Sequence, residues 1–559
     1  MERLSQNNFI YFLVMLLVVF TVFGRSIFFE YIHLDEDILI TGNSYFYKTS
    51  SAITEIFNYN IYYPTGATAY YRPFYVLSFI ADTYLGGLPW IFHTTNIILH
   101  AVASFLVFIF IKKLQTLGKN KDDLSSGGVA LLLSLIFSVH PIITQAVSWI
   151  PARGDILLAI FLLLSAIYFL EYLLKQKGKY LIGHLLFFTF ALLSKETAFM
   201  FPIFCLFYIY YFFGNRFTIY LNVYLISGWV AVSALWFWLR QNAINSAGIE
   251  DVSLVKILGV VFNNISAIPF YIGKILLPIN ISVFPLLKDS SLVYGFAAIG
   301  AMSFYAVWNR LSLTKYFFIG LVWMILFLIP TMLNYDDPSQ MAFFEHRAYL
   351  PLIGFLIMIL DFVPKLNFKY DKIFGAGLVS LLALTTYNYN LNFKDGSVFW
   401  REAVRASPNS ARAHAELGMV YNAEKNIVDA ERELKKAIEL NPKEKKVYNN
   451  LALLYIKQNQ LDIAEGYLKK ELEVDSRSVI ANFNLGNIYA RQNRFEEAFF
   501  HWQEALKNDP NHVLTHESLI KYYYLKMDLE KINEHINEIT QRGFPLSQEI
   551  NEILKNKNE

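Results

Sequence analysis

The chain has 559 residues, of which 55% are hydrophobic and only 17% are charged, and its mean hydropathy is +0.35. Because a soluble domain carries about 25% charged residues, this composition excludes a purely soluble protein and predicts an integral membrane domain. The net charge of +2 gives no reason to expect nucleic-acid binding, and a single cysteine, Cys205, excludes a disulfide framework within the chain.

The distribution of charge along the sequence predicts two domains. Residues before about 390 are apolar and aromatic, whereas the chain after Phe393 is rich in Glu, Lys, Arg and Asn. We therefore expect an all-α protein, with a polytopic membrane domain over residues 1–392 and a soluble domain over residues 393–559.

The membrane domain contains about eleven segments that approach the roughly 20 apolar residues needed to cross a bilayer. The predicted spans are 9–29, 91–111, 127–148, 155–174, 180–194, 197–213, 218–239, 292–308, 316–333, 348–363 and 373–390. Residues 253–285 are also apolar but contain Lys256, Lys274 and several prolines. We expect helices there that lie in the outer interface or dip back into it, not a further span.

The first span is too long for the apolar region of a signal peptide and is not followed by a small-residue cleavage site. We therefore expect a retained helix with a cytoplasmic N-terminus. With eleven spans, the short basic loops all fall on one side, which the positive-inside rule makes the cytoplasm. These loops are 112–121, 175–179, 215–216, 309–315 and 364–372. The C-terminal domain is then predicted to be extracytoplasmic.

The C-terminal domain has an internal period of 34 residues. Leu417, Leu451 and Leu485 share one phase, and so do Ala430, Ala464 and Ala498. The pattern resembles the tetratricopeptide repeat, with copies near 411–444, 445–478 and 479–512 and a degenerate copy near 513–546. Stacked repeats of this kind form an α-solenoid with a concave binding face.

Two asparagines each precede a repeat leucine. Asn450 and Asn484 both lie on the predicted concave helices, where amides can donate to and accept from the peptide bonds of an extended acceptor. Solvated polar residues on a helix face would give the same pattern, so the sequence leaves both interpretations open.

Polar residues gather at the span ends that face the outer side. Charges at membrane depth are costly unless they are paired or hydrated, so their recurrence on one side indicates a cavity that opens to the outer interface. Its basic members, Arg72, Arg153, Lys195 and Arg347, are candidate ligands of a phosphate group, although salt-bridged turns would explain each of them singly. The other candidate residues are Asp35, Glu36, Asp37, His140, Asp155, Glu196, Lys274, Glu345 and His346.

The motifs at these span ends have a recognisable order. They are "DE" at residues 35–36, "YYRPF", "HPIITQAVSWIPARGDIL", "LLSKE" and "EHRAYLP", followed by the repeats. This order resembles the transmembrane and tetratricopeptide-repeat O-mannosyltransferases, which have the C-type glycosyltransferase fold. The resemblance implies transfer of a sugar, with inversion, from a polyprenyl-phosphate carrier to a hydroxyl group on the outer face.

The same resemblance implies roles for the first motif. Asp35 matches the catalytic base of the family's acidic pair, and Glu36 is expected to orient the acceptor or to share the work of the base, so both are predicted catalytic residues. The chain departs from the family pattern at Gln145, where an acid is usual, at Glu36, where Asp is frequent, and at Asp37, which is an additional acid. A serine or threonine hydroxyl has a pKa far above 7, so its attack on an anomeric carbon needs a positioned base.

The sequence therefore predicts a mannosyltransferase that acts on Ser/Thr hydroxyls of proteins, with a protein or peptide acceptor recruited by the repeats. An enzyme of the same fold that modifies a lipid or polysaccharide, and a non-catalytic scaffold, are the alternatives. Its donor would be a polyprenyl-phosphate sugar, and a divalent metal is possible but not favoured because cations are already present. A bacterial or archaeal plasma membrane is favoured over the endoplasmic reticulum.

Overall fold

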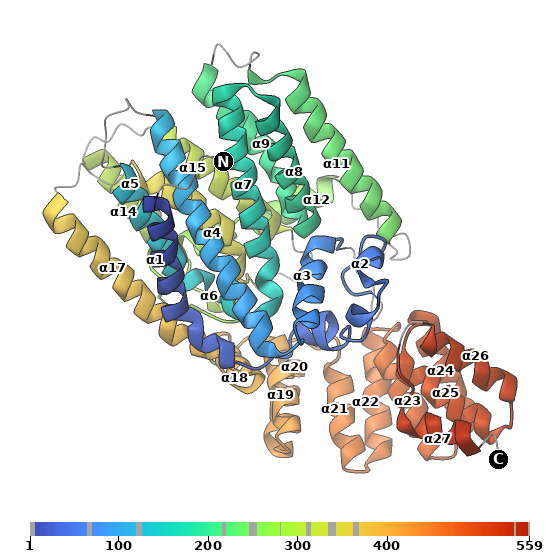
Figure 1. Ribbon diagram of the computed structural model, residues 1–559. Coiled ribbons are helices and arrows are strands. Elements are labelled where there is room, and N and C mark those ends of the chain that lie inside the picture. Colours follow the sequence, from blue (N-terminus) through green and yellow to red (C-terminus); the bar gives the residue numbers. More distant parts are fainter. Residues whose placement is uncertain are drawn as a thin grey trace. The chain divides into compact units, whose positions relative to one another are not determined.

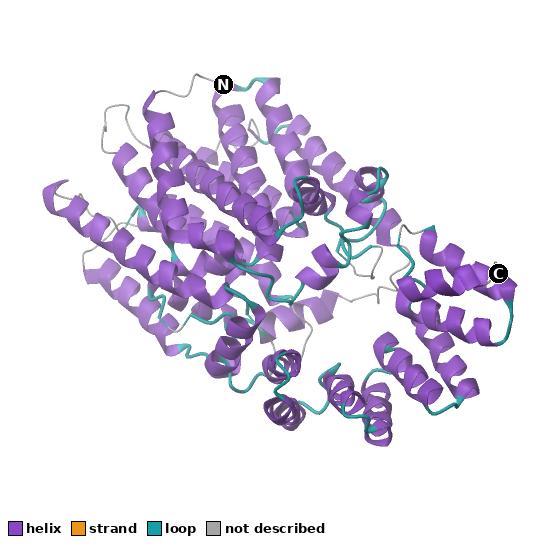
Figure 2. Ribbon diagram, turned by 60° about the horizontal axis from the view of Figure 1, so that its bottom comes forward, coloured by secondary structure: helices purple, strands orange, loops and turns teal. Residues whose placement is uncertain are grey.

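A computed structural model describes residues 6–63, 70–118, 126–214, 220–244, 254–279, 281–308, 315–333, 343–361, 368–541 and 544–556. Within these ranges, all secondary-structure elements are helices and no strand occurs (Figure 2), which confirms the all-α prediction. The chain forms two compact units. One unit contains Met1–Glu36, Glu55–Ile61 and Ala69–Glu402, and the other contains Asp37–Thr54, Tyr62–Thr68 and Ala403–Glu559.

The first unit is a bundle of apolar helices, many of which run side by side (Figure 1). Its first half contains α1 (Gln6–Phe23), α3 (Pro73–Tyr84), α4 (Pro89–Gly118), α5 (Ser126–Val139), α6 (Thr144–Ser148), α7 (Arg153–Lys175) and α8 (Gly178–Ser194). Its second half contains α9 (Met200–Phe213), α11 (Val223–Ile244), α12 (Leu254–Asn263), α13 (Ala267–Leu276), α14 (Val293–Trp308), α15 (Lys315–Leu328), α16 (Tyr349–Ile359) and α17 (Phe368–Tyr389).

Six helical segments in the described part of the chain are long and apolar enough to cross a membrane. A seventh is formed if Gly127–Val139 and Pro141–Ser148, which meet at a bend of 49°, make one broken span. Each of the predicted spans contains a helix, but the count of about eleven stays a prediction. Several of the basic loops used to assign orientation, including 215–216 and 309–314, lie outside the described residues, so the predicted sidedness is untested.

The region at 253–285 contains two short helices, α12 and α13, separated by a turn. Each has 10 residues, which corresponds to a length of about 15 Å, roughly half the thickness of a bilayer core. Neither helix could therefore cross by itself, in keeping with the prediction that this region is not a further span.

Close packing of α15 against α16 depends on two glycines. A Cβ atom added to Gly320 would collide with the carbonyl oxygen of Gly354, and one added to Gly354 would collide with that of Gly320. Small residues at a crossing allow two membrane helices to approach closely. Trp323, on the same face of α15, is fully buried and donates its indole N–H to the carbonyl of Leu350 at 2.9 Å.

The second unit contains the repeats as helix pairs with the predicted period (Figure 1). The pairs are α19 (Ala411–Ala423) with α20 (Ile427–Leu440), α21 (Val447–Lys457) with α22 (Leu461–Val474), α23 (Val479–Arg491) with α24 (Phe495–Asn508), and α25 (Val513–Leu525) with α26 (Leu529–Thr540). A last helix, α27 (Gln548–Asn556), follows them. Ala430, Ala464 and Ala498 are fully buried, as expected for small residues where paired helices meet.

Helix starts and turns explain why the period is so regular. Ser410 and Ser478 cap α19 and α23 by accepting a backbone N–H through the side-chain oxygen. The turn within each pair contains one residue with positive φ. These residues are Lys425, Asn459, Asn493 and Met527, with φ of 62°, 59°, 61° and 57°.

Candidate active site

The acidic residues lie in a turn that follows α1. The chain turns at His33, whose φ of 59° lies in the left-handed region. Glu36 is buried, Asp35 is half-buried and Asp37 is exposed. The Oε2 atom of Glu36 accepts the backbone N–H groups of Leu34 at 3.1 Å and of Asp35 at 3.2 Å. Glu36 therefore holds the backbone that presents Asp35.

The surroundings of Glu36 favour its neutral form. Burial raises the pKa of Glu36 to about 7, and the negative charge of Asp35 adds to this effect. Backbone N–H groups, including that of Leu34, and the side chain of Trp149 lower the pKa but do not offset burial. Near neutral pH, this carboxyl group is thus poised between its two protonation states.

Trp149, which lies between α6 and α7, connects this acidic turn to the "EHR" motif. The Trp149 and Phe344 rings stack with centroids 6.0 Å apart, and the Trp149 and His346 ring centroids are 5.4 Å apart. Phe344 stacks in turn on His346, and the guanidinium carbon of Arg347 lies 5.7 Å from the centroid of the Phe344 ring. Aromatic contacts therefore link the vicinity of Glu36 with a cation far away in the sequence.

Of the four cations predicted to bind phosphate, Arg153 is the most enclosed. Its side chain is 0% exposed, and its NH2 atom lies 2.6 Å from Oδ2 of Asp82. Its other N–H groups donate to Asn96 Oδ1 at 2.6 Å and to the carbonyl and hydroxyl oxygens of Ser78 at 3.1 and 3.2 Å. Protein groups thus already occupy this guanidinium, and its contact with the donor phosphate stays a prediction.

Arg72 and Lys195 also have acidic partners. Arg72 pairs with both carboxylate oxygens of Glu196, at 2.9 Å for Nε. Lys195 donates to Oδ1 and Oδ2 of Asp155, each at 2.8 Å. Although burial opposes it, the Glu196 carboxylate raises the pKa of Arg72 above its usual range. Burial lowers the pKa of Lys195, and the positive charge of Arg72 adds to this lowering, so the two pairs lie close together.

Arg347 differs from these three cations. It is half-buried, and it donates from NH1 to the carbonyl oxygen of Thr331 at 3.4 Å. Within the described residues, it is the one member of the predicted phosphate-binding set that forms no ion pair with a carboxylate. It is therefore the cation of this set with the greatest capacity to bind an added anion.

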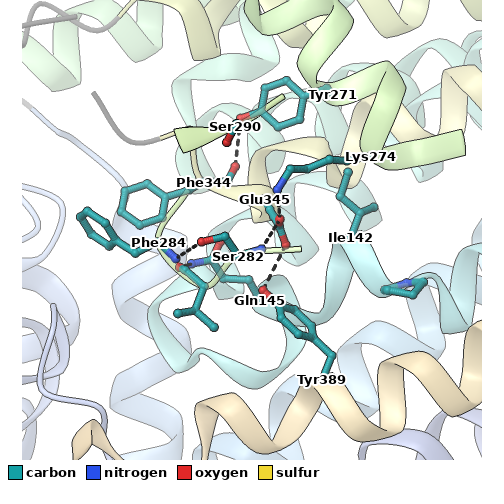
Figure 3. A network of polar contacts seen from close by, with 12 residues as sticks. Ile142, Gln145, Tyr271, Lys274, Ser282, Phe284, Ser290, Phe344, Glu345 and Tyr389 are labelled. Carbon is teal, nitrogen blue, oxygen red and sulfur yellow. Dashed lines mark hydrogen bonds and ion pairs between the residues drawn. The ribbon is translucent and has the colours of Figure 1, made fainter. Parts of the chain in front are cut away.

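Lys274 and Glu345 form a second buried network (Figure 3). The Oε1 atom of Glu345 accepts from Lys274 Nζ at 2.7 Å and from the backbone N–H of Ser282 at 2.8 Å. Its Oε2 atom accepts from the hydroxyl of Tyr389 at 3.2 Å. The network ties α13, the 281–284 segment and α17 to the turn that carries Arg347, so these residues position the site.

His140 bonds to α13, whereas Gln145 bonds to the turn that carries Arg347. His140 bonds through Nε2 to the carbonyl of Ile275 at 2.9 Å, and its Nδ1 accepts the backbone N–H of Ile142 at 3.2 Å. Gln145 bonds through its amide both to Val283 and to His346. The residue that departs from the family pattern therefore contacts the "EHR" motif directly.

Sequence reasoning missed several members of the site. Trp149 and Tyr389 were not singled out, and neither was Asn96, which accepts from Arg153. An aromatic residue between the polar "TQ" and "RGD" stretches was the available signal for Trp149, because both neighbouring motifs were assigned to the site. Tyr389 and Asn96 carry no comparable local signal.

In the repeat unit, the two predicted peptide-binding asparagines have different surroundings. Asn450 is half-buried, whereas Asn484 is 9% exposed and donates its amide to Oδ1 of Asn449 at 2.8 Å. Asn450 is thus the more accessible of the two.

No group of three His, Cys, Asp or Glu side chains that could hold a metal ion occurs within the residues that the structure describes. The predicted site residues Asp35, Asp37 and Glu36 thus do not form such a group in this conformation.

Comparison with known proteins supports the assignment of the repeats and finds relatives that are named protein O-mannosyl-transferases. Three tetratricopeptide-repeat family models match residues 411–444, 433–466 and 479–512. A protein O-mannosyl-transferase, human TMTC1, is 39% identical over 103 residues, which are 18% of this chain and 10% of the relative. Mouse TMTC4 is 39% identical over 101 residues, 17% of this chain and 14% of its own length. Over these residues, the chain is similar in sequence to TMTC proteins.

The TMTC-like similarity is partial. Tmtc1 of Drosophila melanogaster is 33% identical over 135 residues, which are 24% of this chain and 15% of that protein. The matched part therefore spans less than a sixth of each of these relatives. Among solved structures, YrrB, a tetratricopeptide-repeat protein, covers 34% of this chain and 90% of its own at 21% identity, with a TM-score of 0.23. A score this low adds nothing to the assignment.

Proposed function

We propose that the chain is a membrane mannosyltransferase that modifies Ser/Thr hydroxyls of proteins, with a polyprenyl-phosphate sugar as donor. The observation that carries this proposal is the acidic turn, where a buried Glu36 holds the backbone of a half-buried Asp35. The similarity to proteins named protein O-mannosyl-transferases supports the choice of reaction. The apolar helices support a place in a lipid bilayer, for which we propose a bacterial or archaeal plasma membrane.

Asp35 is the proposed general base. Its carboxylate removes the proton from the acceptor hydroxyl as that oxygen attacks the anomeric carbon of the sugar. A new carbon–oxygen bond forms on one face of the sugar while the bond to the phosphate oxygen breaks on the other, so configuration inverts in one step. The electron pair leaves with the polyprenyl phosphate. Glu36 acts as a positioning residue, because it bonds to the Asp35 backbone.

Arg347 is the proposed first ligand of the leaving phosphate, since it lacks a carboxylate partner among the described residues. Charge that develops on the phosphate is stabilised by a guanidinium, which can bond to two oxygens at once. Lys195 and Arg72 contribute positive potential to the same region, although each is already bound to an acid. In this scheme, cations supply the stabilisation that a divalent metal could otherwise provide.

The repeats are proposed to bind the acceptor protein. A solenoid presents a concave surface on which an extended peptide can bond through its backbone, and Asn450 is the accessible candidate for such a contact. A peptide bound in this way would stay close to the enzyme at a high effective concentration. We also propose that the N-terminus is cytoplasmic and that the repeats are extracytoplasmic.

The test uses the full chain in detergent or nanodiscs with polyprenyl-phosphate mannose and a Ser/Thr-rich peptide, and detects glycopeptide by mass spectrometry. We expect product from the unchanged protein and from Asp37→Asn, a matched change at the exposed neighbour, but a loss of at least a hundredfold with Asp35→Asn. Full activity of Asp35→Asn would exclude this base. Donor consumption without glycopeptide would indicate a lipid or polysaccharide acceptor, and no consumption at all would favour a scaffold.

A further inference from the structure

The orientation of the Gln145 amide is fixed by two backbone groups. Its Nε2 atom lies 3.1 Å from the carbonyl oxygen of Val283, and its Oε1 atom lies 3.2 Å from the backbone nitrogen of His346. A carbonyl can only accept and a backbone N–H can only donate. Exchanging the two amide atoms would set donor against donor and acceptor against acceptor, so only one orientation satisfies both contacts.

This orientation determines where the proton of His346 resides. The imidazole Nδ1 lies 3.1 Å from the same Oε1 of Gln145, which can only accept. Nδ1 must therefore carry the proton, and Nε2 of the neutral ring has a free lone pair. Burial holds the pKa of His346 well below its usual range, and the charges of Lys195, Arg347 and Arg72 lower it further, so the ring is neutral at pH 7.

The Nε2 atom of His346 lies near a second hydrogen-bond acceptor, the Asp155 carboxylate. Nε2 of His346 and Oδ2 of Asp155 are 4.0 Å apart, which is too long for a hydrogen bond. No hydrogen bond to this Nε2 occurs within the residues that the structure describes. Both side chains keep 10% of their surface exposed. Oδ2 of Asp155 accepts one hydrogen bond, from Lys195 Nζ at 2.8 Å, and a carboxylate oxygen can accept a second one. The two adjacent atoms can therefore each accept one hydrogen bond from a bound ligand.

We infer that His346 Nε2 and Asp155 Oδ2 together form a subsite for two neighbouring hydroxyls of the transferred sugar. One hydroxyl donates to the ring nitrogen and the next one to the carboxylate, which a single hydroxyl with its one proton cannot do. The positive charge of Arg347 acts on the His346 ring at short range, so a phosphate held by Arg347 would bring the attached sugar close to this pair. The inference rests on the proposed function and deepens it, because it assigns recognition of a vicinal diol to named atoms.

Gln145 acts on this subsite as a positioning residue. It contacts neither the sugar nor the phosphate in this arrangement, but it keeps the proton on Nδ1. A carboxylate at residue 145 would instead stabilise the doubly protonated imidazolium, because it attracts the positive ring. Nε2 would then carry a proton and could no longer accept from a sugar hydroxyl.

The first measurement needs no turnover. Full-length protein labelled with ¹⁵N-histidine is reconstituted in nanodiscs, and the His346 signals are assigned by comparison with His346→Asn. We expect a protonated Nδ1 and an unprotonated Nε2 at pH 7 in the free protein. Addition of polyprenyl-phosphate mannose should move the Nε2 signal toward the hydrogen-bonded position, whereas polyprenyl phosphate without a sugar should not. A protonated Nε2, or an Nε2 signal that the donor leaves unchanged, overturns the inference.

The second measurement is the affinity for the donor and for its 2-, 3- and 4-deoxy analogues. Removal of either hydroxyl of the recognised pair should weaken binding roughly tenfold, whereas removal of the remaining one should have little effect. Gln145→Glu should weaken binding of the intact donor by a similar factor and reduce its discrimination against the deoxy analogues. Gln458→Glu, the same change at an exposed residue of the repeats, serves as the matched control.

The two proposals fail differently. A protein that binds no polyprenyl-phosphate sugar contradicts the proposed function itself. A protein that binds the donor but does not distinguish it from any deoxy analogue retains the proposed function and excludes the diol subsite. A melting temperature of Gln145→Glu close to that of the unchanged protein is required before its affinity is interpreted.

Discussion

Asp82 and Arg153 form an ion pair in the interior of the apolar unit, with 2.6 Å between Oδ2 and NH2 and with side chains that are 3% and 0% exposed. The pair joins α3 to the start of α7, and Thr95 on α4 donates a further hydrogen bond to Asp82 at 2.7 Å. Such a pair is costly to break, since either charge alone would remain buried without a counterion.

The first prediction therefore concerns stability. Arg153→Leu should lower the free energy of unfolding by about 3–5 kcal/mol, because it leaves the Asp82 carboxylate unpaired. The double change Asp82→Leu with Arg153→Leu should recover part of this loss. Thermal unfolding in detergent measures both effects. Lys394→Ala removes an exposed pair at 3.9 Å and should change stability by less than about 1 kcal/mol. Equal destabilisation by the single and double changes would contradict the explanation.

The second prediction is a pH dependence that arises from Glu36. Its pKa rises from an ordinary value of 4.5 to about 7 on folding, chiefly because of burial. The folded state therefore holds this proton more tightly than the unfolded chain does. The resulting stabilisation is complete below pH 4.5 and is lost as the pH rises through about 7, on the order of 1.4 kcal/mol per pH unit.

Glu36→Gln tests this dependence, since the amide imitates the neutral acid. The variant should gain stability relative to the unchanged protein as the pH increases from 4.5 toward 7. Melting temperatures of both proteins across this interval provide the comparison, with Asp37→Asn as the exposed control. A constant difference between the two melting temperatures at all pH values would show that Glu36 does not titrate there.

The third prediction separates Arg347 from the paired cations. Arg347→Gln should weaken binding of a polyprenyl-phosphate sugar roughly tenfold or more, because a hydrogen bond to a charged group contributes about 1.5–3 kcal/mol. It should cost little stability, since no buried carboxylate loses its partner. Binding in nanodiscs and thermal unfolding give the two readouts, and Arg401→Gln, at an exposed arginine, controls for the loss of charge. Unchanged affinity would remove Arg347 from the phosphate site.

The fourth prediction concerns the turn of the last repeat. Met527 has a φ of 57° and is 87% exposed, whereas the equivalent residues in two earlier repeats are Asn459 and Asn493. The left-handed conformation costs most residues about 1–2 kcal/mol, but asparagine adopts it more readily. Met527→Asn should therefore stabilise the repeats by up to about 1 kcal/mol.

Limited proteolysis of the C-terminal unit and its melting temperature measure this gain. Lys526→Asn is the matched control, because this neighbouring residue has an ordinary φ of −89°. If both substitutions have the same effect, the conformation of the turn does not explain it.

The repeats were predictable because their signal is local. Leu417, Leu451 and Leu485 recur at the repeat period of 34 residues, and the structure buries all three. The positions of apolar helices were predictable for the same reason, since composition over about 20 residues decides them. Neither conclusion required knowledge of which helices pack together.

The pairing of charges was not predictable from the sequence. In the sequence, Arg153 and Lys195 look alike, because each is a cation at the end of a predicted span. In the structure, Arg153 is fully buried in an ion pair with Asp82, whereas the side chain of Lys195, paired with Asp155, is 16% exposed. Which acid lies opposite which cation depends on how α3, α4, α7 and α8 pack, and one sequence does not contain that information directly. The contact of Gln145 with His346, 201 residues apart, is hidden for the same reason.

The chain passes from the first compact unit to the second between Glu36 and Asp37. This boundary has a practical consequence for experiments on fragments of the protein. Asp37–Thr54 belongs to the same compact unit as Ala403–Glu559, and its Leu39, Ile40, Phe46, Tyr47 and Ala52 side chains are buried. A recombinant fragment that starts near residue 393 would carry every repeat but lack this segment of its own fold. Peptide affinities measured on such a truncated fragment would describe a protein with missing packing, so acceptor binding should be studied on the intact polypeptide.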